Sequence, residues 1–199
     1  YDPYSSSKGC AELVTSSYRS SFLQDQGVGL ASVRAGNVIG GGDWADDRLI
    51  PDILRSFEKS EPVVIRNPKA TRPWQHVLEP LSGYLILAEK LYKNQKEYAE
   101  GWNFGPNEQD VKSVDWIVNE MTLKWPNSSC RLDSNYNPYE AVFLKLDILK
   151  SKSRLGWQPV WELNYTLEKI VNWHRAWIGK ENIQAVCLAE IKEYTRSMK

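Results

Sequence analysis

The sequence predicts an α/β fold, because segments with a helical spacing of apolar residues alternate with short apolar segments bounded by glycine or proline. Neither a helical bundle nor a β-sandwich has this alternation. At 199 residues the chain is long enough for one substantial core, or for one domain with a smaller lobe. The sequence has no internal repeat, low-complexity segment or linker that would divide it further.

The first part of the chain predicts a long helix, a strand, a loop and a second helix. Residues 5–26 have a helical apolar period and are followed by Gly27, a common helix stop. Residues 28–33 are short, apolar and bounded by glycines, as in a buried strand. Glycines 40–42 predict a flexible turn, because no helix begins directly after them to receive a pyrophosphate. Residues 46–57 predict a helix.

The remaining elements follow the same alternation. After the short apolar strand 63–65 comes a polar loop that runs through Arg72. Pro80 suits the first turn of the next helix, where its missing N–H costs nothing. We expect helices over 80–92, 114–123, 147–155, 163–177 and 183–194, and strands over 102–104 and 130–132.

Charge and hydropathy exclude several kinds of partner. Lysines and arginines balance aspartates and glutamates at 25 each, so the chain creates no field that attracts nucleic acid or an anionic membrane. No run reaches the roughly 18 apolar residues that a membrane span needs, and the first residues do not resemble a signal peptide. We therefore expect a soluble, cytoplasmic protein that binds neither nucleic acid nor membrane.

The cysteines and histidines do not predict a metal site. Cys10, Cys130 and Cys187 are far apart and odd in number, which is typical of reduced, buried thiols in a reducing compartment. His76 and His174 have no zinc-site spacing relative to these cysteines. We expect no bound metal.

Tyr4 and Lys8 are the strongest catalytic candidates in the sequence. One helical turn places their side chains on the same face, where the ammonium favours the phenolate over the phenol. Such a tyrosine can take a proton from a sugar hydroxyl while hydride leaves the same carbon. The four-residue spacing alone does not identify a catalytic pair, because solvated helix faces also contain such pairs. Tyr92/Lys96 and Tyr165/Lys169 have the same spacing.

The order of motifs is more specific than any one of them. The chain contains Tyr4-Ser-Ser-Ser-Lys8, Val33-Arg-Ala-Gly-Asn-Val-Ile-Gly40, Arg48-Leu-Ile-Pro51, Arg72-Pro-Trp-Gln-His-Val77, Trp102-Asn-Phe-Gly105 and Leu155-Gly-Trp-Gln-Pro159. Together they resemble the extended short-chain dehydrogenase/reductase family that acts on nucleotide sugars, over nearly the whole chain.

The resemblance implies part of a Rossmann-type NAD-binding fold with a smaller α/β substrate-binding lobe. Residues 1–45 and about 77–106 would be Rossmann core elements, and residues 46–76 and 107–199 would form mainly the lobe. The chain would be the C-terminal portion of such a protein, with the glycine-rich dinucleotide-binding half before residue 1.

The resemblance also implies roles for individual residues. Tyr4 would be the active-site base, and Lys8 would tune it while hydrogen-bonding the nicotinamide ribose of tightly held NAD. The expected substrate-binding residues are Asn37, Arg48, Leu49, Ile65, Arg72, Asn103 and Glu140. Of these, Asn37 and Arg72 would meet the diphosphate, Asn103 the diphosphate or its ribose, and Leu49 and Ile65 would enclose the base.

Each of these residues also has a purely structural interpretation. Asn37 and Asn103 could satisfy turns, Arg72 could cap a helix or pair with Glu79, and Leu49 and Ile65 could be core residues. Near Glu140 the chain departs from the family pattern: Tyr139 stands where similar enzymes often have histidine, which puts a role for that site in doubt.

Within the family, Gly41-Gly-Asp-Trp44 and Arg72-Pro-Trp-Gln-His76 look most like the branch that oxidises a nucleotide sugar at carbon 4 and removes water across carbons 5 and 6, with CDP-glucose as the expected substrate. The implied setting is deoxysugar supply for surface polysaccharide such as lipopolysaccharide O-antigen, by a homodimer or higher homo-oligomer. A nucleotide-sugar 4-epimerase or decarboxylase would share these residues. A non-catalytic nucleotide-sugar-binding fragment is the alternative from another class.

Overall fold

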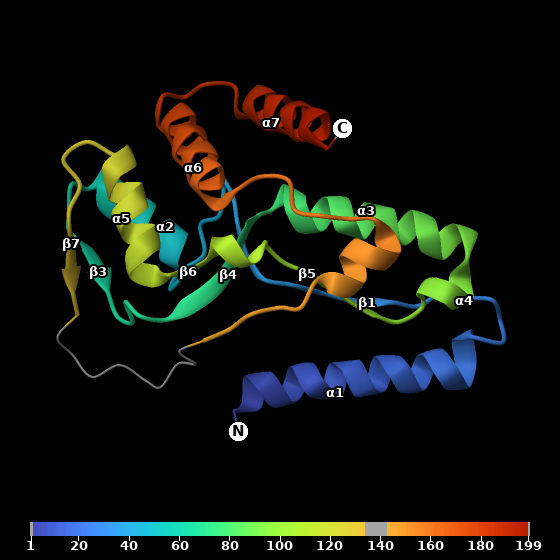
Figure 1. The fold of residues 1–199 in the computed structure, drawn as a ribbon. Coiled ribbons are helices and arrows are strands. Elements are labelled where there is room, and N and C mark those ends of the chain that lie inside the picture. Colours follow the sequence, from blue (N-terminus) through green and yellow to red (C-terminus); the bar gives the residue numbers. More distant parts are fainter. Residues whose placement is uncertain (1, 134–142, 199) are drawn as a thin grey trace. The chain divides into compact units, whose positions relative to one another are not determined.

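The computed structural model describes residues 2–133 and 143–198 (Figure 1). Helices and strands alternate along the chain, which confirms the α/β prediction. Contacts divide the chain into two compact units. The first comprises Tyr1–Ala35, Pro80–Phe104 and Asp147–Gln158, and the second comprises Gly36–Glu79, Gly105–Leu146 and Pro159–Lys199. None of the helices in the described ranges is both long and apolar enough to cross a membrane.

The first unit is built around two parallel strands, in which Ser32 lies opposite Gly101 and Ala35 opposite Phe104. Helices precede and follow each strand (Figure 1). Its elements are α1 (Pro3–Tyr18), the π-helical turn η1 (Arg19–Leu23), β1 (Ser32–Ala35), α3 (Leu78–Lys93, which starts in the second unit), α4 (Gln95–Tyr98), β5 (Gly101–Phe104) and the π-helical turn η3 (Ser151–Leu155).

The second unit contains two small sheets and most of the remaining helices. One sheet has the order β2-β4-β6, with β2 parallel and β6 antiparallel to β4, and the other pairs β3 with β7 in parallel. The elements are β2 (Asn37–Ile39), α2 (Leu49–Glu58), β3 (Val63–Ile65), β4 (Thr71–His76), η2 (Glu108–Asp110), β6 (Val111–Ser113), α5 (Val114–Lys124), β7 (Cys130–Leu132), α6 (Leu163–Ile178) and α7 (Ile183–Ser197).

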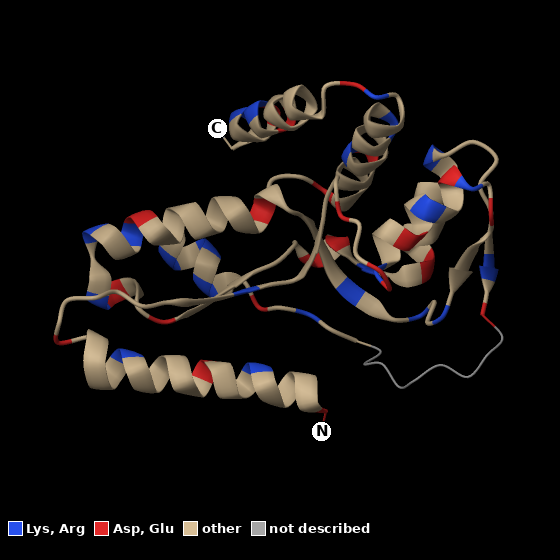
Figure 2. Ribbon diagram, turned by 180° about the vertical axis from the view of Figure 1, so that it is seen from behind, with Lys and Arg blue, Asp and Glu red and all other residues tan. Residues whose placement is uncertain are grey.

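Helix α1 begins where the sequence provides a cap. The Asp2 carboxylate accepts a hydrogen bond from the Ser5 N–H at 2.9 Å, and Pro3 occupies the first turn. Of its sixteen residues only Lys8 and Glu12 are charged, so the ribbon is mostly tan in Figure 2. Glu12 ties the helix to β1 by accepting from the Ser32 hydroxyl at 2.7 Å.

The core of the second unit joins α2, α5 and α6 to the sheets. Ile53, Ile117, Met121, Leu167 and Ile170 are all fully buried there. Each contributes about 1.5–3 kcal/mol of apolar burial, so this cluster holds the helices against the strands. Leu49 is partly buried and packs against the same cluster, of which Ile65 is a member.

The first unit has an aromatic core in which α3 lies very close to β5. Phe104 and Trp157 meet edge to face with ring centroids 5.0 Å apart. A Cβ placed on Gly83 of α3 would lie 2.2 Å from the Phe104 ring, so this position accepts no side chain without movement. The Trp157 indole N–H donates to the Ser82 hydroxyl at 3.0 Å, which satisfies its polar atom.

Several local predictions were wrong. The strand expected over 28–33 begins only at Ser32, because the ladder starts where Gly101 of β5 lies opposite that residue. The segment through Arg72, expected to be a loop, leads into β4 at Thr71, and β2 and β6 were missed altogether. Pro73 fits β4 because β6 pairs with residues 71–73 and β2 with 74–76, so Pro73 is paired on one side only.

The cysteines also differ from the prediction. All three are free thiols, but Cys10 and Cys130 are exposed and Cys187 is half-buried. Cys10 is exposed because it lies on α1, a helix without any buried residue. Cys130 is exposed because it lies on β7, a strand in which every residue is exposed.

Two buried titratable groups lie at and just beyond the end of β4. The His76 ring is 2% exposed and contacts the Trp161 ring in a tilted arrangement with centroids 4.9 Å apart; burial, together with the positive charge of Lys169, lowers its pKa to about 4. Burial raises the pKa of the Glu79 carboxyl, although that carboxylate accepts hydrogen bonds from the Trp161 N–H and the Tyr194 hydroxyl, both at 2.7 Å. His76 is therefore neutral near pH 7, and Glu79 joins α3 to the C-terminal segment.

Candidate functional site

Tyr4 and Lys8 lie in the first turns of α1 and on one face of it, as the sequence predicts. The Lys8 ammonium is 5.3 Å from the centroid of the Tyr4 ring, within the range of a cation–π contact. Tyr4 is 71% exposed, so its phenolic oxygen is open to a ligand. The structure therefore confirms that the two side chains share one exposed face of α1.

The other two tyrosine–lysine pairs differ from this one. Tyr165 donates its hydroxyl hydrogen to Glu193, and the Lys169 ammonium lies 2.7 Å from the same carboxylate. That pair therefore connects α6 to α7. Tyr92 is 87% exposed on α3, and its neighbour Lys93 bonds to Glu89 one turn earlier. The contacts with Glu193 support the structural interpretation for Tyr165/Lys169, and the exposure of Tyr92 is what a solvated helix face produces.

Asn37 and Arg72 are brought together by the β2-β4-β6 sheet. Asn37 lies opposite Trp74, and Arg72 precedes Trp74 by two residues, so all three side chains leave the same face. Ordinary sheet spacings then place the Cα atoms of Asn37 and Arg72 roughly 8 Å apart. The sheet therefore joins two of the residues expected to contact a diphosphate, at the end of a face whose Trp74 is buried in the core.

The same face carries a second cation that sequence reasoning missed. Lys112 of β6 lies directly opposite Arg72, and its ammonium is 5.4 Å from the centroid of the Trp116 ring. The Trp74 indole N–H donates to the Lys112 carbonyl at 2.9 Å, which fixes this register. A strand of three residues has no detectable period, so only the pairing reveals that Lys112 is next to Arg72.

Arg48, Leu49 and Ile65 lie around the N-terminus of α2. Arg48 is the exposed residue that precedes the helix, and its carbonyl accepts from the Asp52 N–H at 2.9 Å. Leu49 is half-buried against the core cluster that contains Ile65. Ile65 itself is only 4% exposed, so in this structure it acts mainly as a core residue, which was the alternative interpretation.

Asn103 belongs to the first unit and has structural contacts. Its side-chain amide donates to the Asp147 carbonyl at 3.0 Å, and its backbone carbonyl accepts from the Ser151 hydroxyl at 2.5 Å. These bonds attach the η3 segment to β5. The Asn103 Oδ1 atom is buried and accepts no hydrogen bond from a described residue. Glu140 lies outside the described residues.

The glycine turn at 40–42 does not have the form of a dinucleotide-binding loop. A Cβ on Gly41 would lie 2.2 Å from the Trp173 ring, so the backbone approaches a tryptophan at this point. The next helix begins only at Leu49, too late for its N-terminus to receive a pyrophosphate at the turn. The residues that fit a nicotinamide cofactor are therefore Tyr4 and Lys8, an exposed hydroxyl and ammonium suited to ribose oxygens.

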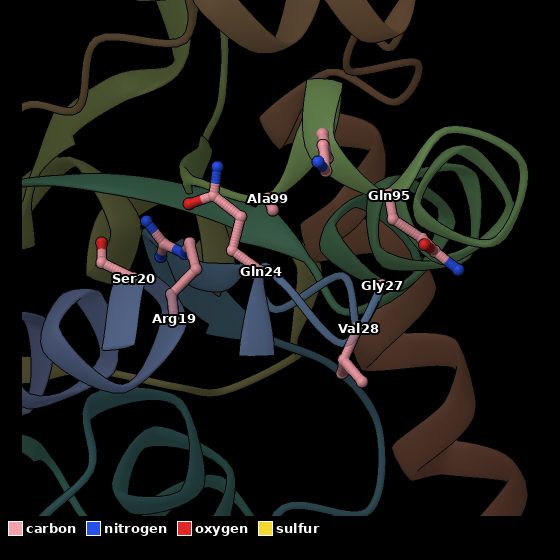
Figure 3. A pocket seen from close by; sticks show the side chains of 8 residues that line it. Arg19, Ser20, Gln24, Gly27, Val28, Gln95 and Ala99 are labelled. Carbon is pink, nitrogen blue, oxygen red and sulfur yellow. The ribbon is translucent and has the colours of Figure 1, made fainter. Parts of the chain in front are cut away.

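A cavity of about 260 Å³ lies in the first unit between η1, the turn that follows it and α4 (Figure 3). Its lining includes Arg19 and Gln24 but none of the residues predicted from the sequence. Arg19 follows Lys8 by eleven residues, about 16 Å along a helix, so the cavity lies at the other end of α1 from the tyrosine–lysine pair.

Comparison with known proteins agrees with these features. The sequence model of the NAD dependent epimerase/dehydratase family matches residues 1–101. A CDP-glucose 4,6-dehydratase from Salmonella typhimurium is 56% identical over 98% of the chain, and the chain spans 56% of its length. The chain thus covers about half of this curated relative.

Solved structures show the same fold at low sequence identity. A dTDP-glucose 4,6-dehydratase from Bacillus anthracis, in complex with NAD, has a TM-score of 0.67 and 21% identity, over 88% of this chain and 52% of its own. A UDP-glucose 4-epimerase from Thermotoga maritima has a TM-score of 0.69 and 19% identity, over 89% and 55%. The fold is therefore of the Rossmann type, as expected, and the chain belongs to the NAD dependent epimerase/dehydratase family.

Proposed function

We propose that the full-length protein is an NAD-dependent CDP-glucose 4,6-dehydratase, which converts CDP-glucose to CDP-4-dehydro-6-deoxyglucose. The observation that carries the proposal is the 56% identity to a curated enzyme of that name over 98% of this chain. The exposed Tyr4/Lys8 pair supports it, because the first step needs a base at a sugar hydroxyl.

In the proposed reaction, Lys8 stabilises the phenolate form of Tyr4, and this phenolate takes the proton of the sugar 4-hydroxyl. NAD, when bound, supplies the acceptor and later the donor of the hydride. The ketone at carbon 4 makes the proton at carbon 5 acidic, so that water can leave across carbons 5 and 6. The acid and base for that elimination are expected N-terminal to Tyr4. Addition of the hydride to carbon 6 and of a proton to carbon 5 would then give the 4-dehydro-6-deoxysugar.

The second unit supplies the proposed substrate lobe, and the first unit part of the cofactor domain. Arg72 on the central strand lies between Asn37 on one neighbouring strand and Lys112 on the other, a set suited to a diphosphate. Arg48 and Leu49 supply a cation and an apolar edge for the nucleotide end. Ile65 would contribute only the edge that is still exposed.

We also propose that the enzyme is a cytoplasmic homodimer or higher homo-oligomer that supplies a deoxysugar for surface polysaccharide. Leu13, Val14, Tyr18 and Phe22 of the α1–η1 segment are all more than half exposed. Apolar side chains at this density favour burial by another surface. Light scattering of the full-length protein at micromolar concentration tests the assembly, and a monomer would refute it.

Substrate comparison tests the proposed function. The full-length protein with NAD is given CDP-glucose, UDP-glucose, dTDP-glucose or UDP-glucuronic acid, and the product mass is followed with time. We expect loss of one water, with the highest kcat/KM for CDP-glucose. An unchanged mass with inverted carbon 4 would identify a 4-epimerase instead, and loss of carbon dioxide from a uronic acid substrate would identify a decarboxylase. Binding of a nucleotide sugar without any turnover would identify a non-catalytic binding protein.

A further inference from the structure

The loop between β2 and α2, residues 40–48, rests directly on α6. A Cβ on Gly41 would meet three atoms of the Trp173 indole at 2.2 to 2.7 Å. Gly42 has a φ of 78° and lies against the same ring, with its Cβ position 3.2 Å from Cζ2. The absence of side chains thus lets the backbone lie on the face of Trp173, a close approach that fixes the start of the loop.

Trp44 extends this contact along α6. Its ring centroid is 4.6 Å from that of Trp177 and 5.8 Å from that of His174. His174 is 1% exposed, and its Nε2 lies 2.6 Å from the Glu58 carboxylate; because a carboxylate only accepts, Nε2 carries the hydrogen. Trp173, His174 and Trp177 therefore form one surface, here called the aromatic platform, whose middle residue is anchored to the end of α2.

The other side of the loop is held by arginines. Arg55 of α2 donates to the carbonyls of Trp44 and Ala45, each at 3.2 Å. Arg66 donates to the Asp47 carboxylate at 2.8 Å, where the backbone has a φ of 57°. Asp47 immediately precedes Arg48, so the restraints extend to the residues assigned to the nucleotide.

We propose that the aromatic platform of α6 positions the loop so that Arg48 and Leu49 are pre-arranged for the nucleotide end of the substrate. This rests on the proposed function. Trp173, His174 and Trp177 are then positioning residues, because they act through the loop and touch no reacting atom. A held loop loses less conformational freedom when the ligand binds, so the platform raises nucleotide affinity without adding a contact.

Trp177→Ala is the decisive variant, because Trp177 is 43% exposed and its removal leaves the core intact. Three properties are measured in the full-length protein: CDP affinity by calorimetry, kcat and KM for CDP-glucose, and amide exchange in residues 40–49. Loss of one aromatic pair should weaken CDP binding about three- to tenfold. KM should rise by a similar factor while kcat stays within about twofold, and exchange should become faster.

Leu123→Ala is the matched control, since Leu123 is 80% exposed on α5 of the same unit and lies outside the platform. It should leave all three properties unchanged. CDP affinity or loop exchange in Trp177→Ala equal to that of the parent would overturn the inference, as would a fall in kcat at constant KM. A parent protein that does not bind CDP would instead refute the proposed function, so the two failures are distinguishable.

Gly41→Ala gives a second, steric test with its own rescue. The added methyl group must displace the loop from Trp173, so CDP binding should weaken by more than in Trp177→Ala. Combining it with Trp173→Leu makes room for the methyl group and should restore part of the affinity. A double variant that binds CDP no better than Gly41→Ala contradicts the proposed contact. Gly179→Ala is the control, because Gly179 lies at the end of α6 with a φ of −68° that alanine readily adopts. It should leave CDP binding unchanged.

Discussion

Replacing His76 by glutamine should make the stability of the protein less sensitive to acid. His76 is 2% exposed, and its pKa of about 4 lies below the ordinary 6.5 that it regains on unfolding. Between these values the unfolded state binds the extra proton, so stability is present above pH 6.5 and is lost as pH falls toward 4. Between pH 7 and pH 5 the loss works out to about 2 kcal/mol.

Glutamine keeps an acceptor for the Leu78 N–H, which His76 Nδ1 binds at 3.3 Å, but it does not titrate. The raised pKa of Glu79 acts in the opposite direction, because the folded state then binds the proton and stability falls as pH rises. Both proteins contain Glu79, so that effect cancels in the comparison. Urea unfolding of parent and variant at pH 7 and pH 5 measures the difference. If the two lose the same stability on acidification, His76 is not held neutral by burial.

Three further predictions concern the site and the packing. Tyr4→Phe in the full-length protein should retain NAD and the fold but lose most turnover, because it removes only the phenolic oxygen; a near-normal rate would exclude Tyr4 as the base. Arg72→Ala should weaken CDP and CDP-glucose binding by about 2–4 kcal/mol in calorimetry, with Arg72→Lys restoring only part, and parental affinity in Arg72→Ala would make the residue structural. Gly83→Ala should destabilise by about 1–3 kcal/mol in urea, since its Cβ would overlap the Phe104 ring. Gly9→Ala, with nothing within 4 Å, should instead stabilise by up to about 1 kcal/mol; equal effects would refute the close contact.

Long helices could be predicted from the sequence because their apolar residues recur with the helical period. The helices expected over 114–123 and 163–177 are confirmed to within one residue, as α5 and α6. Strands β2 and β6 could not be found in this way because each has three residues and a polar end, and β4 could not because it is largely polar and contains Pro73. Their existence depends on pairing with one another, a long-range property that no local pattern records.

In the candidate site, too, local features could be predicted and long-range features could not. The one-turn spacing of Tyr4 and Lys8 predicted their shared face, because helix geometry is local. Lys112 escaped notice because only the antiparallel register places it opposite Arg72. The turn at Gly41 was predicted to be flexible, since the sequence does not reveal that Trp173, more than a hundred residues later, fills the space beside it. Contacts of this kind, between distant segments, determine the structure that a local motif adopts.

The most direct test of the central claim follows the hydrogen at carbon 4 of the sugar. Full-length protein with unlabelled NAD is given CDP-glucose that carries deuterium at carbon 4, and the product is analysed by mass spectrometry and NMR. We expect a product lighter by one water, with the deuterium in the new methyl group at carbon 6. Deuterium returned to carbon 4 without loss of water, or no reaction at all, would contradict that claim.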